Sequence, residues 1–218
     1  MIITKIRRVR GRKPRYVIEF DDAPALETSD WTIGRFGLCT GDMIDDIKRS
    51  QIATAEAEAQ AKNVAINFLS YRPRSRKEIE THLVKKGFDD AISEQAAEKL
   101  QSLGMVNDLE FARMFVRDRL QRKKIGAALL RQQLIQKGIA RAILDMVLAE
   151  LVTPEQQQHT ALEAATRHAQ RSHFTLRKKK NSPVERQKQK KRLFDFLVRR
   201  GFSLDLARQT VDAIFSKD

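Results

Sequence analysis

Hydrophobic positions change their spacing along the chain near residue 40. Before that point, residues 2–6 and 16–20 are rich in β-branched and aromatic side chains and flank a turn-forming cluster at residues 10–14. A third short run of the same kind spans residues 31–38 and predicts one more strand. We therefore expect a small antiparallel sheet over residues 1–40, which needs a neighbouring element because a lone hairpin is marginal in water.

After residue 40 the apolar spacing is helical. Residues 42–72 contain neither Pro nor Gly, and Pro73 ends the helix that they predict. Later helix starts are marked by capping residues, in which a short polar side chain satisfies a free backbone amide. These starts are Ser75 with Glu78, Asn107 with Glu110, Thr153 with Gln156, and Ser182 with Glu185. The body of the protein is therefore predicted to be mainly α-helical.

One motif recurs three times within this helical part. The sequence LVKKGF at residues 83–88 returns as LIQKGI at 134–139 and as LVRRGF at 197–202. In each copy an apolar pair ends a helix, a basic residue complements the helix dipole, and a glycine (Gly87, Gly138 and Gly201) takes the left-handed cap. The following apolar residue is expected to fold back onto the helix, so the pattern predicts a repeating three-helix module.

The repeats predict the domain organisation. We expect a β-hairpin or small sheet at residues 1–40, a connecting helix at 41–59, and three-helix repeats at 60–106, 107–152 and 153–218, the last with a basic insertion. One such repeat buries too little surface to be stable alone, so neighbours must stack. Tandem stacking predicts an elongated, curved rod.

Composition adds a strong charge to this picture. The 218 residues contain 42 Lys and Arg against 28 Asp and Glu, a formal net charge of +14. This excess is unlike that of an ordinary metabolic enzyme and predicts a polyanionic or acidic partner. The single Cys39 rules out an intrachain disulfide and favours a reducing compartment. No apolar run reaches the ~20 residues of a membrane span, so a cytoplasmic protein is expected.

Basic residues recur at the joints and caps of the predicted repeats, where they form a candidate stripe for binding a polyanionic partner such as the phosphate backbone of DNA. Its members are Arg72, Arg74, Arg76, Lys85, Lys86, Arg119, Arg122, Lys123, Lys124, Lys137, Arg177, Lys178, Lys179, Lys180, Arg199 and Arg200. Taken singly, each is also explained as a solvated or dipole-complementing side chain. Recurrence at one place in three repeats favours a continuous stripe. The segment at 171–192 is interpreted either as a mobile loop with a frayed helix start or as an arm that orders on nucleic acid or on an acidic groove.

Catalytic and metal sites are not indicated. The four histidines lack the His-Glu-x-x-His spacing, and no cysteine or aspartate cluster accompanies them. The acidic residues Asp42, Asp45 and Asp46 are typical of a helix N-terminus rather than a calcium loop. There is no glycine-rich phosphate loop. We therefore expect no enzyme activity, no metal and no cofactor.

The repeats carry a resemblance to a known family. Residues 107–119 (NDLEFARMFVRDR), Gly126 and LIQKGI at 134–139 are similar to the central repeat of the RecX family of bacterial recombinase regulators. RPRS at 72–75, Glu78, Ile79 and LVKKGF resemble the opening repeat of that family. Phe196, Leu197 and RRGFS at 199–203 resemble its last repeat. The similarity covers residues 60–217.

This resemblance implies a non-enzymatic regulator of the RecA recombinase in DNA repair, recombination and the SOS response. Such a protein lies along the groove of the RecA–DNA filament, bridges its protomers and mostly inhibits filament extension, strand exchange, ATP hydrolysis and co-protease activity. The implied partners are the RecA filament and, through phosphate contacts, single- and double-stranded DNA. A monomer is expected, because tandem repeats need no dimer.

Two other functions are compatible with the residues. A helix-turn-helix DNA-binding protein uses a similar three-helix scaffold, but the helix after Gly87 begins with Asp89 and Asp90, which disfavours a role in reading DNA. An α-repeat scaffold that binds an acidic protein would need no nucleic acid. Binding of DNA in the absence of any protein partner discriminates between this scaffold and the other two functions.

Overall fold

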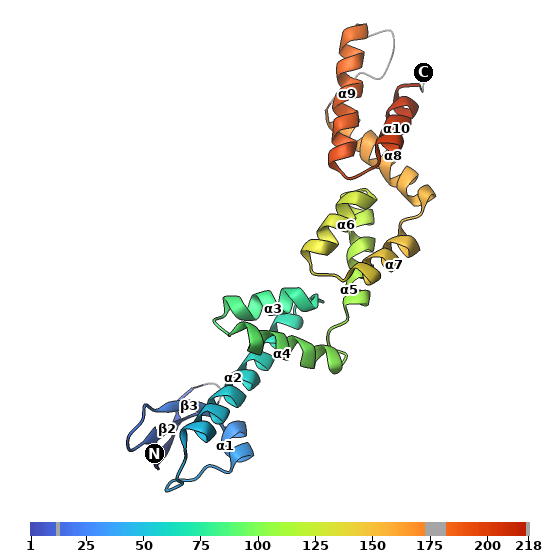
Figure 1. The fold of residues 1–218 in the computed structure, drawn as a ribbon. Coiled ribbons are helices and arrows are strands. Elements are labelled where there is room, and N and C mark those ends of the chain that lie inside the picture. The colour runs from blue at the N-terminus through green and yellow to red at the C-terminus, as the bar shows by residue number, and fades with distance from the viewer. Residues whose placement is uncertain (12–13, 173–181, 217–218) are drawn as a thin grey trace. The chain divides into compact units, whose positions relative to one another are not determined.

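The computed structural model describes residues 1–11, 14–172 and 182–216 (Figure 1). The chain divides into two compact units. Unit 1 comprises Met1–Pro73 and Ile79–Met105, and unit 2 comprises Arg74–Glu78 and Val106–Asp218. The sheet and the first repeat lie in unit 1, apart from the first turn of one helix. The other two repeats lie in unit 2.

Unit 1 begins with a three-stranded antiparallel sheet. Strands β1 (Ile3–Val9), β2 (Arg15–Phe20) and β3 (Leu26–Ser29) follow one another in the order β1-β2-β3. One face of the sheet contributes Ile3 and Ile18 to a core that also contains Ile52 from the following long helix. The predicted small antiparallel sheet is therefore confirmed, and that helix is the neighbour that it needs.

The predicted strand at residues 31–38 is wrong. These residues belong mainly to helix α1 (Asp30–Phe36), and β3 lies just before them. Ser29 caps α1 by accepting a hydrogen bond from the backbone amide of Thr32, and Gly37 ends it with φ 58°. The local aromatic and β-branched residues favour a strand. The cap at each end, together with packing on the next helix, outweighs that preference.

Three helices complete unit 1. Helix α2 (Asp46–Leu69) is continuous through residues 59 and 60, so the expected connecting helix and the first helix of repeat 1 are one element. Asp45 caps it by accepting a hydrogen bond from the amide of Lys48 at 2.6 Å. Helices α3 (Arg76–Lys85) and α4 (Asp90–Ser102) follow. Helix α4 packs along α2 and closes the unit.

Unit 2 contains two three-helix modules. The first consists of α5 (Asp108–Asp118), a π-helical turn η1 (Arg119–Lys123), α6 (Ala127–Gln136) and α7 (Arg141–Leu151). The second consists of α8 (Pro154–Arg171), α9 (Pro183–Arg199) and α10 (Leu204–Ser216). Each module has its own apolar core. The predicted class, tandem three-helix repeats after a small sheet, is confirmed.

The three glycine caps form as the sequence predicts. Gly87, Gly138 and Gly201 have φ values of +92°, +75° and +83°. In each cap the backbone amide of the residue after the glycine donates to the carbonyl of the leucine that opens the motif. In the first copy, the amide of Phe88 donates to the carbonyl of Leu83 at 3.2 Å. This six-residue closure is the Schellman motif, which needs a residue that tolerates the left-handed conformation.

Within unit 2, the cap of α9 abuts the beginning of α6. The amide of Gly126 donates to the carbonyl of Arg200 at 2.8 Å, and the amide of Ala128 donates to the carbonyl of Gly201 at 3.1 Å. Free amides at the start of one helix thus satisfy free carbonyls at the end of another. A Cβ on Gly201 would lie 2.3 Å from the backbone nitrogen of Leu129. The close approach therefore requires glycine.

Candidate nucleic-acid interface

The net charge of the protein is carried by one of its units. By sequence, unit 1 contains 15 Lys and Arg against 15 Asp and Glu, whereas unit 2 contains 27 against 13. The difference in unit 2 is 27 − 13 = +14, which equals the net charge of the whole chain. A polyanion is therefore attracted to unit 2, while the charges of unit 1 balance one another.

A basic pocket lies in unit 2 where three elements meet. Its volume is about 290 Å³. The turn η1 and the residue after it, helix α8 and helix α9 all contribute cations to its wall. These cations are Arg122, Lys123, Lys124, Arg167, Arg171 and Arg200, and Ala164, His168 and Phe196 complete the lining. No acidic residue is among these lining residues, so the pocket suits an anion such as a phosphate group.

The turn η1 directs three consecutive cations to the pocket. The amide of Lys124 donates to the carbonyl of Arg119 at 3.0 Å and so closes the wide π-helical turn. Leu120 and Ile125 on either side of the cationic run are buried and anchor it in the core. Lys124 has φ +52°, a left-handed conformation that costs a non-glycine residue about 1–2 kcal/mol. Such turns are frequent at functional sites.

Two of the pocket cations also hold the pocket together. The Lys124 ammonium lies 2.5 Å from Glu163 of α8, and the Lys124 side chain is only 18% exposed. Arg200 donates to the carbonyl of Lys123 at 2.5 Å, and its guanidinium lies 5.0 Å from the centre of the Phe196 ring. These contacts tie η1 to α8 and α9 without neutralising Arg200 by a carboxylate.

The remaining pocket cations are exposed. Arg122 pairs with Asp118 at 2.9 Å, yet its side chain is 79% exposed. Lys123, Arg167 and Arg171 are also exposed. Exposed surface ion pairs contribute little to stability, so an anionic ligand could replace Asp118 as the partner of Arg122 at a small cost in free energy. An incoming anion can therefore contact the guanidinium and ammonium groups around the rim of the pocket.

His168 forms an uncharged part of the wall. Its imidazole stacks on Phe196 with ring centres 3.9 Å apart and an angle of 9° between the planes. Burial lowers the pKa of His168, and the nearby Arg199 and Arg200 lower it further. The lowered pKa favours the neutral ring at pH 7, so His168 adds no positive charge next to the cations.

Two other predicted site residues of unit 2, Arg119 and Lys137, make contacts within the fold. Arg119 donates to Gln133 at 3.1 Å and to Asp118 at 3.3 Å, and it lies 4.5 Å from the centre of the Phe115 ring. Lys137 pairs with Glu78 at 2.6 Å. Both residues are half-buried. Of the others, Arg199 is exposed at the end of α9, while Arg74 and Arg76 are half-buried near the start of α3.

The predicted residues of unit 1 do not line the basic pocket. Arg72, Lys85 and Lys86 are exposed, and Arg72 donates to the carbonyl of Pro73 at 2.9 Å. They belong to the unit whose charges balance. The predicted residues Arg177, Lys178, Lys179 and Lys180 lie outside the described residues.

Sequence reasoning missed Arg167, and it considered Arg171 only as the first residue of the segment 171–192 and not as a member of the basic stripe. Both lie on α8 four residues apart, and Ala164, His168 and the two arginines share one helical face at spacings of three and four. That spacing is visible in the sequence. Only the packing of α8 against η1 and α9 shows that this face meets the other cations.

The described residues show no features of a metal site or a membrane span. In these ranges, no three His, Cys, Asp or Glu residues gather in a way that could hold a metal ion. No described helix combines the length and apolar character required to cross a bilayer. Cys39 is an exposed free thiol.

Comparisons with known proteins agree on one family. Models of the first, second and third three-helix domains of RecX match residues 61–100, 107–148 and 160–211. The chain is 29% identical over 208 residues to the regulatory protein RecX of Listeria monocytogenes, covering 95% of this chain and 74% of that protein. A crystal structure of regulatory protein RecX superposes with a TM-score of 0.69 at 25% identity, covering 100% of this chain and 99% of that one.

A second solved structure extends this agreement. The crystal structure of RecX from Lactobacillus salivarius has a TM-score of 0.59 at 26% identity, over 73% of this chain and 97% of that one. Sequence similarity, domain order and fold therefore all indicate the same family. The three consecutive RecX domains in this chain show that it belongs to the RecX family of regulatory proteins.

Proposed function

We propose that this protein is a non-enzymatic, cytoplasmic regulator of the RecA recombinase. It binds in the groove of the RecA–DNA filament and modulates, mostly by inhibition, filament extension, strand exchange, ATP hydrolysis and co-protease activity. The observation that carries the proposal is the basic pocket of unit 2, in a chain of the RecX family whose whole net charge lies in that unit.

The chemistry of the pocket supports contact with the DNA backbone. Guanidinium and ammonium groups recognise phosphate oxygens of any sequence, and binding releases the counterions of the DNA. Arg167 and Arg171 project from a helix, which gives them fixed spacing, and Arg200 is oriented by Phe196 and the Lys123 carbonyl. Such contacts position a protein on DNA without reading bases, as a regulator of a filament on any sequence requires.

A helix-turn-helix reading of DNA is less well supported. Helix α4, which follows the first glycine cap, carries Asp90 in its first turn, and Asp89 precedes it at the cap position. Both are exposed. Carboxylates at the N-terminal end of a recognition helix would face the phosphates and acceptor-rich edges of the major groove.

The proposed function is tested on RecA itself. The ATPase activity of RecA on single-stranded DNA is measured while the full-length protein is added from substoichiometric to stoichiometric amounts. Inhibition well below one protein per RecA is expected, because stopping filament growth acts on many subunits at once. No effect on the ATPase at any ratio would contradict the proposal.

A further inference from the structure

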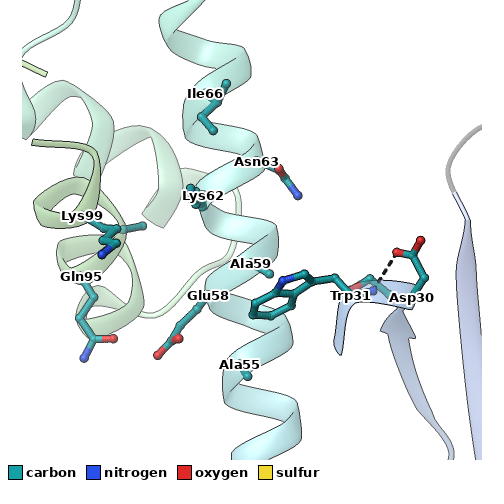
Figure 2. A pocket seen from close by; sticks show the side chains of 12 residues that line it. Asp30, Trp31, Ala55, Glu58, Ala59, Lys62, Asn63, Ile66, Gln95 and Lys99 are labelled. Carbon is teal, nitrogen blue, oxygen red and sulfur yellow. Dashed lines mark hydrogen bonds between the residues drawn. The ribbon is translucent and has the colours of Figure 1, made fainter. Parts of the chain in front are cut away.

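A second cavity lies in unit 1, and its lining shares no residue with the basic pocket. Its volume is about 670 Å³, and α2 and α4 form it together with the corner between β3 and α1 (Figure 2). Trp31, Ala55, Ala59 and Ile66 supply apolar wall. We call it the Trp31 cavity. Its size is in the range of pockets that hold an organic ligand or a side chain.

Trp31 is the largest apolar group on this cavity. It is 52% exposed, although it extends from α1 toward the α2 residues Ala55 and Ala59 (Figure 2). The guanidinium of Arg35 lies 5.1 Å from its ring centre and supports it. A tryptophan beside a cavity is typical of the residues that dominate binding energy at protein interfaces.

The corner that carries Trp31 is held rigidly. The buried carboxylate of Glu56 on α2 accepts hydrogen bonds from the hydroxyls of Thr28, Ser29 and Thr32 at 3.2, 2.8 and 2.6 Å. It also accepts from the amide of Ser29 at 2.9 Å and from Gln60 at 2.7 Å. The backbone on both sides of Trp31 is thus held in place before any partner arrives, which reduces the entropy lost on binding.

The charges around the cavity do not favour a polyanion. Two lysines, Lys62 and Lys99, are matched by two carboxylates, Asp30 and Glu58. Unit 1 as a whole has no net charge. A nucleic-acid strand placed here would gain little from the lysines and would be repelled by the carboxylates. A protein surface with an apolar side chain and mixed polar neighbours complements both the apolar wall and the balanced rim.

We propose that the Trp31 cavity receives an apolar side chain of the protein subunits of the filament, while the basic pocket receives DNA phosphates. This inference rests on the proposed function, since it assigns to unit 1 the contact with the recombinase. In this proposal, unit 1 contacts protein through an apolar cavity with a charge-balanced rim, and unit 2 contacts nucleic acid through its cations.

The test compares two binding partners for the same full-length variants. Binding of Trp31→Ala to RecA filaments on single-stranded DNA is expected to weaken at least tenfold, while its affinity for the same DNA without RecA stays within twofold of the unchanged protein. Ala59→Leu, which fills the cavity and keeps Trp31, should show the same selective loss. Tyr71→Ala is the matched control, because Tyr71 is an exposed aromatic residue of unit 1 (84%) outside the cavity lining.

Each other outcome has a defined meaning. Equal loss on naked DNA and on filaments would show that Trp31 stacks on bases and would overturn the inference, as would unchanged filament binding by both cavity variants. Circular dichroism and thermal melting verify folding, and Ala59→Leu still tests the cavity if Trp31→Ala does not fold. If the unchanged protein binds filaments no better than naked DNA, the proposed function itself fails.

Discussion

At the scale of single residues, the same side-chain type serves different purposes according to its neighbours. Lys124 and Lys137 are tied to Glu163 and Glu78, whereas Arg167 and Arg171 face the basic pocket. A count of cations in the sequence does not separate these roles. The carboxylate within reach of each ammonium group does, and it decides which cations remain available to a ligand.

Removal of the two α8 arginines should weaken DNA binding. In Arg167→Ala/Arg171→Ala, affinity for single-stranded DNA is expected to fall, and the slope of log affinity against log salt should decrease by about 1.4, at about 0.7 per lost phosphate contact. Fluorescence anisotropy over a salt series measures both. Arg141→Ala removes a side chain of unit 2 that is 91% exposed and does not line the pocket, so its slope should change less. Equal slopes for all three proteins would contradict a phosphate site here.

Glu56 makes the stability of unit 1 dependent on pH. Burial raises the pKa of Glu56, but hydrogen bonds from Thr32, Gln60 and Ser29 outweigh burial and hold the pKa below its ordinary 4.5. The ionised form therefore stabilises the fold fully above pH 4.5, and this stabilisation is lost as the pH falls through the lowered folded-state pKa.

Glu56→Gln should accordingly destabilise unit 1 by about 1–3 kcal/mol at pH 7, because charge-assisted hydrogen bonds are replaced by weaker ones. Amide hydrogen exchange in unit 1 at several pH values measures the loss. The difference from the unchanged protein should shrink in acid, where Glu56 itself becomes neutral. A difference that is constant down to pH 3 would show that the charge of Glu56 is unimportant.

At the scale of elements, the glycine caps all end a helix locally, but they differ in whether they also contact a distant element. All three allow the left-handed residue that ends a helix, with φ values between +75° and +92°. Gly201 also lets α9 meet the backbone of α6, whereas nothing lies within 4 Å of a Cβ placed on Gly87. The three copies of the motif are therefore alike in local structure and unlike in packing.

Alanine at these two glycines should reveal the difference. Gly87→Ala is expected to lower the free energy of unfolding by about 1–2 kcal/mol, which is the penalty of the left-handed conformation alone. Gly201→Ala should cost more, by about a further 1–3 kcal/mol, because its Cβ would overlap Leu129. Hydrogen exchange in the unit that carries each glycine measures both losses. Equal costs would mean that α9 and α6 separate easily.

At the scale of the whole molecule, charge is divided unequally between the units. The sequence predicts a basic stripe that recurs in all three repeats. In unit 1, however, 15 Lys and Arg residues are balanced by 15 Asp and Glu residues. We therefore expect long-range attraction for DNA to arise from unit 2.

Charge reversal tests this division with equal changes of net charge. Lys85→Glu/Lys86→Glu in unit 1 and Arg167→Glu/Arg171→Glu in unit 2 each replace two positive charges by two negative ones and so lower the net charge by four. The unit 2 variant is expected to lose more than tenfold in affinity for single-stranded DNA at low salt, and the unit 1 variant less than threefold. Equal losses would favour the continuous stripe through all repeats.

The fold could be predicted where its signals are local. Ser75 and Ser182 cap helices through residues three positions away, and each glycine cap closes within six residues, so the sequence indicates both. The strand predicted at residues 31–38 failed because Ser29, Gly37 and the packing of the corner outweigh β propensity. A preference summed over a few residues does not include such tertiary contacts.

What the sequence by itself determined is the chain of three capped helical modules, the total charge and the family likeness, because each depends on residue identity and short spacing. Only the tertiary structure decided which cations share a pocket and where Trp31 lies. Arg122, Arg167 and Arg200 meet through packing across long stretches of chain. The corner that carries Trp31 is held by the carboxylate of Glu56, 25 residues further along the chain. Such long-range contacts follow from the folded backbone, which local patterns do not contain.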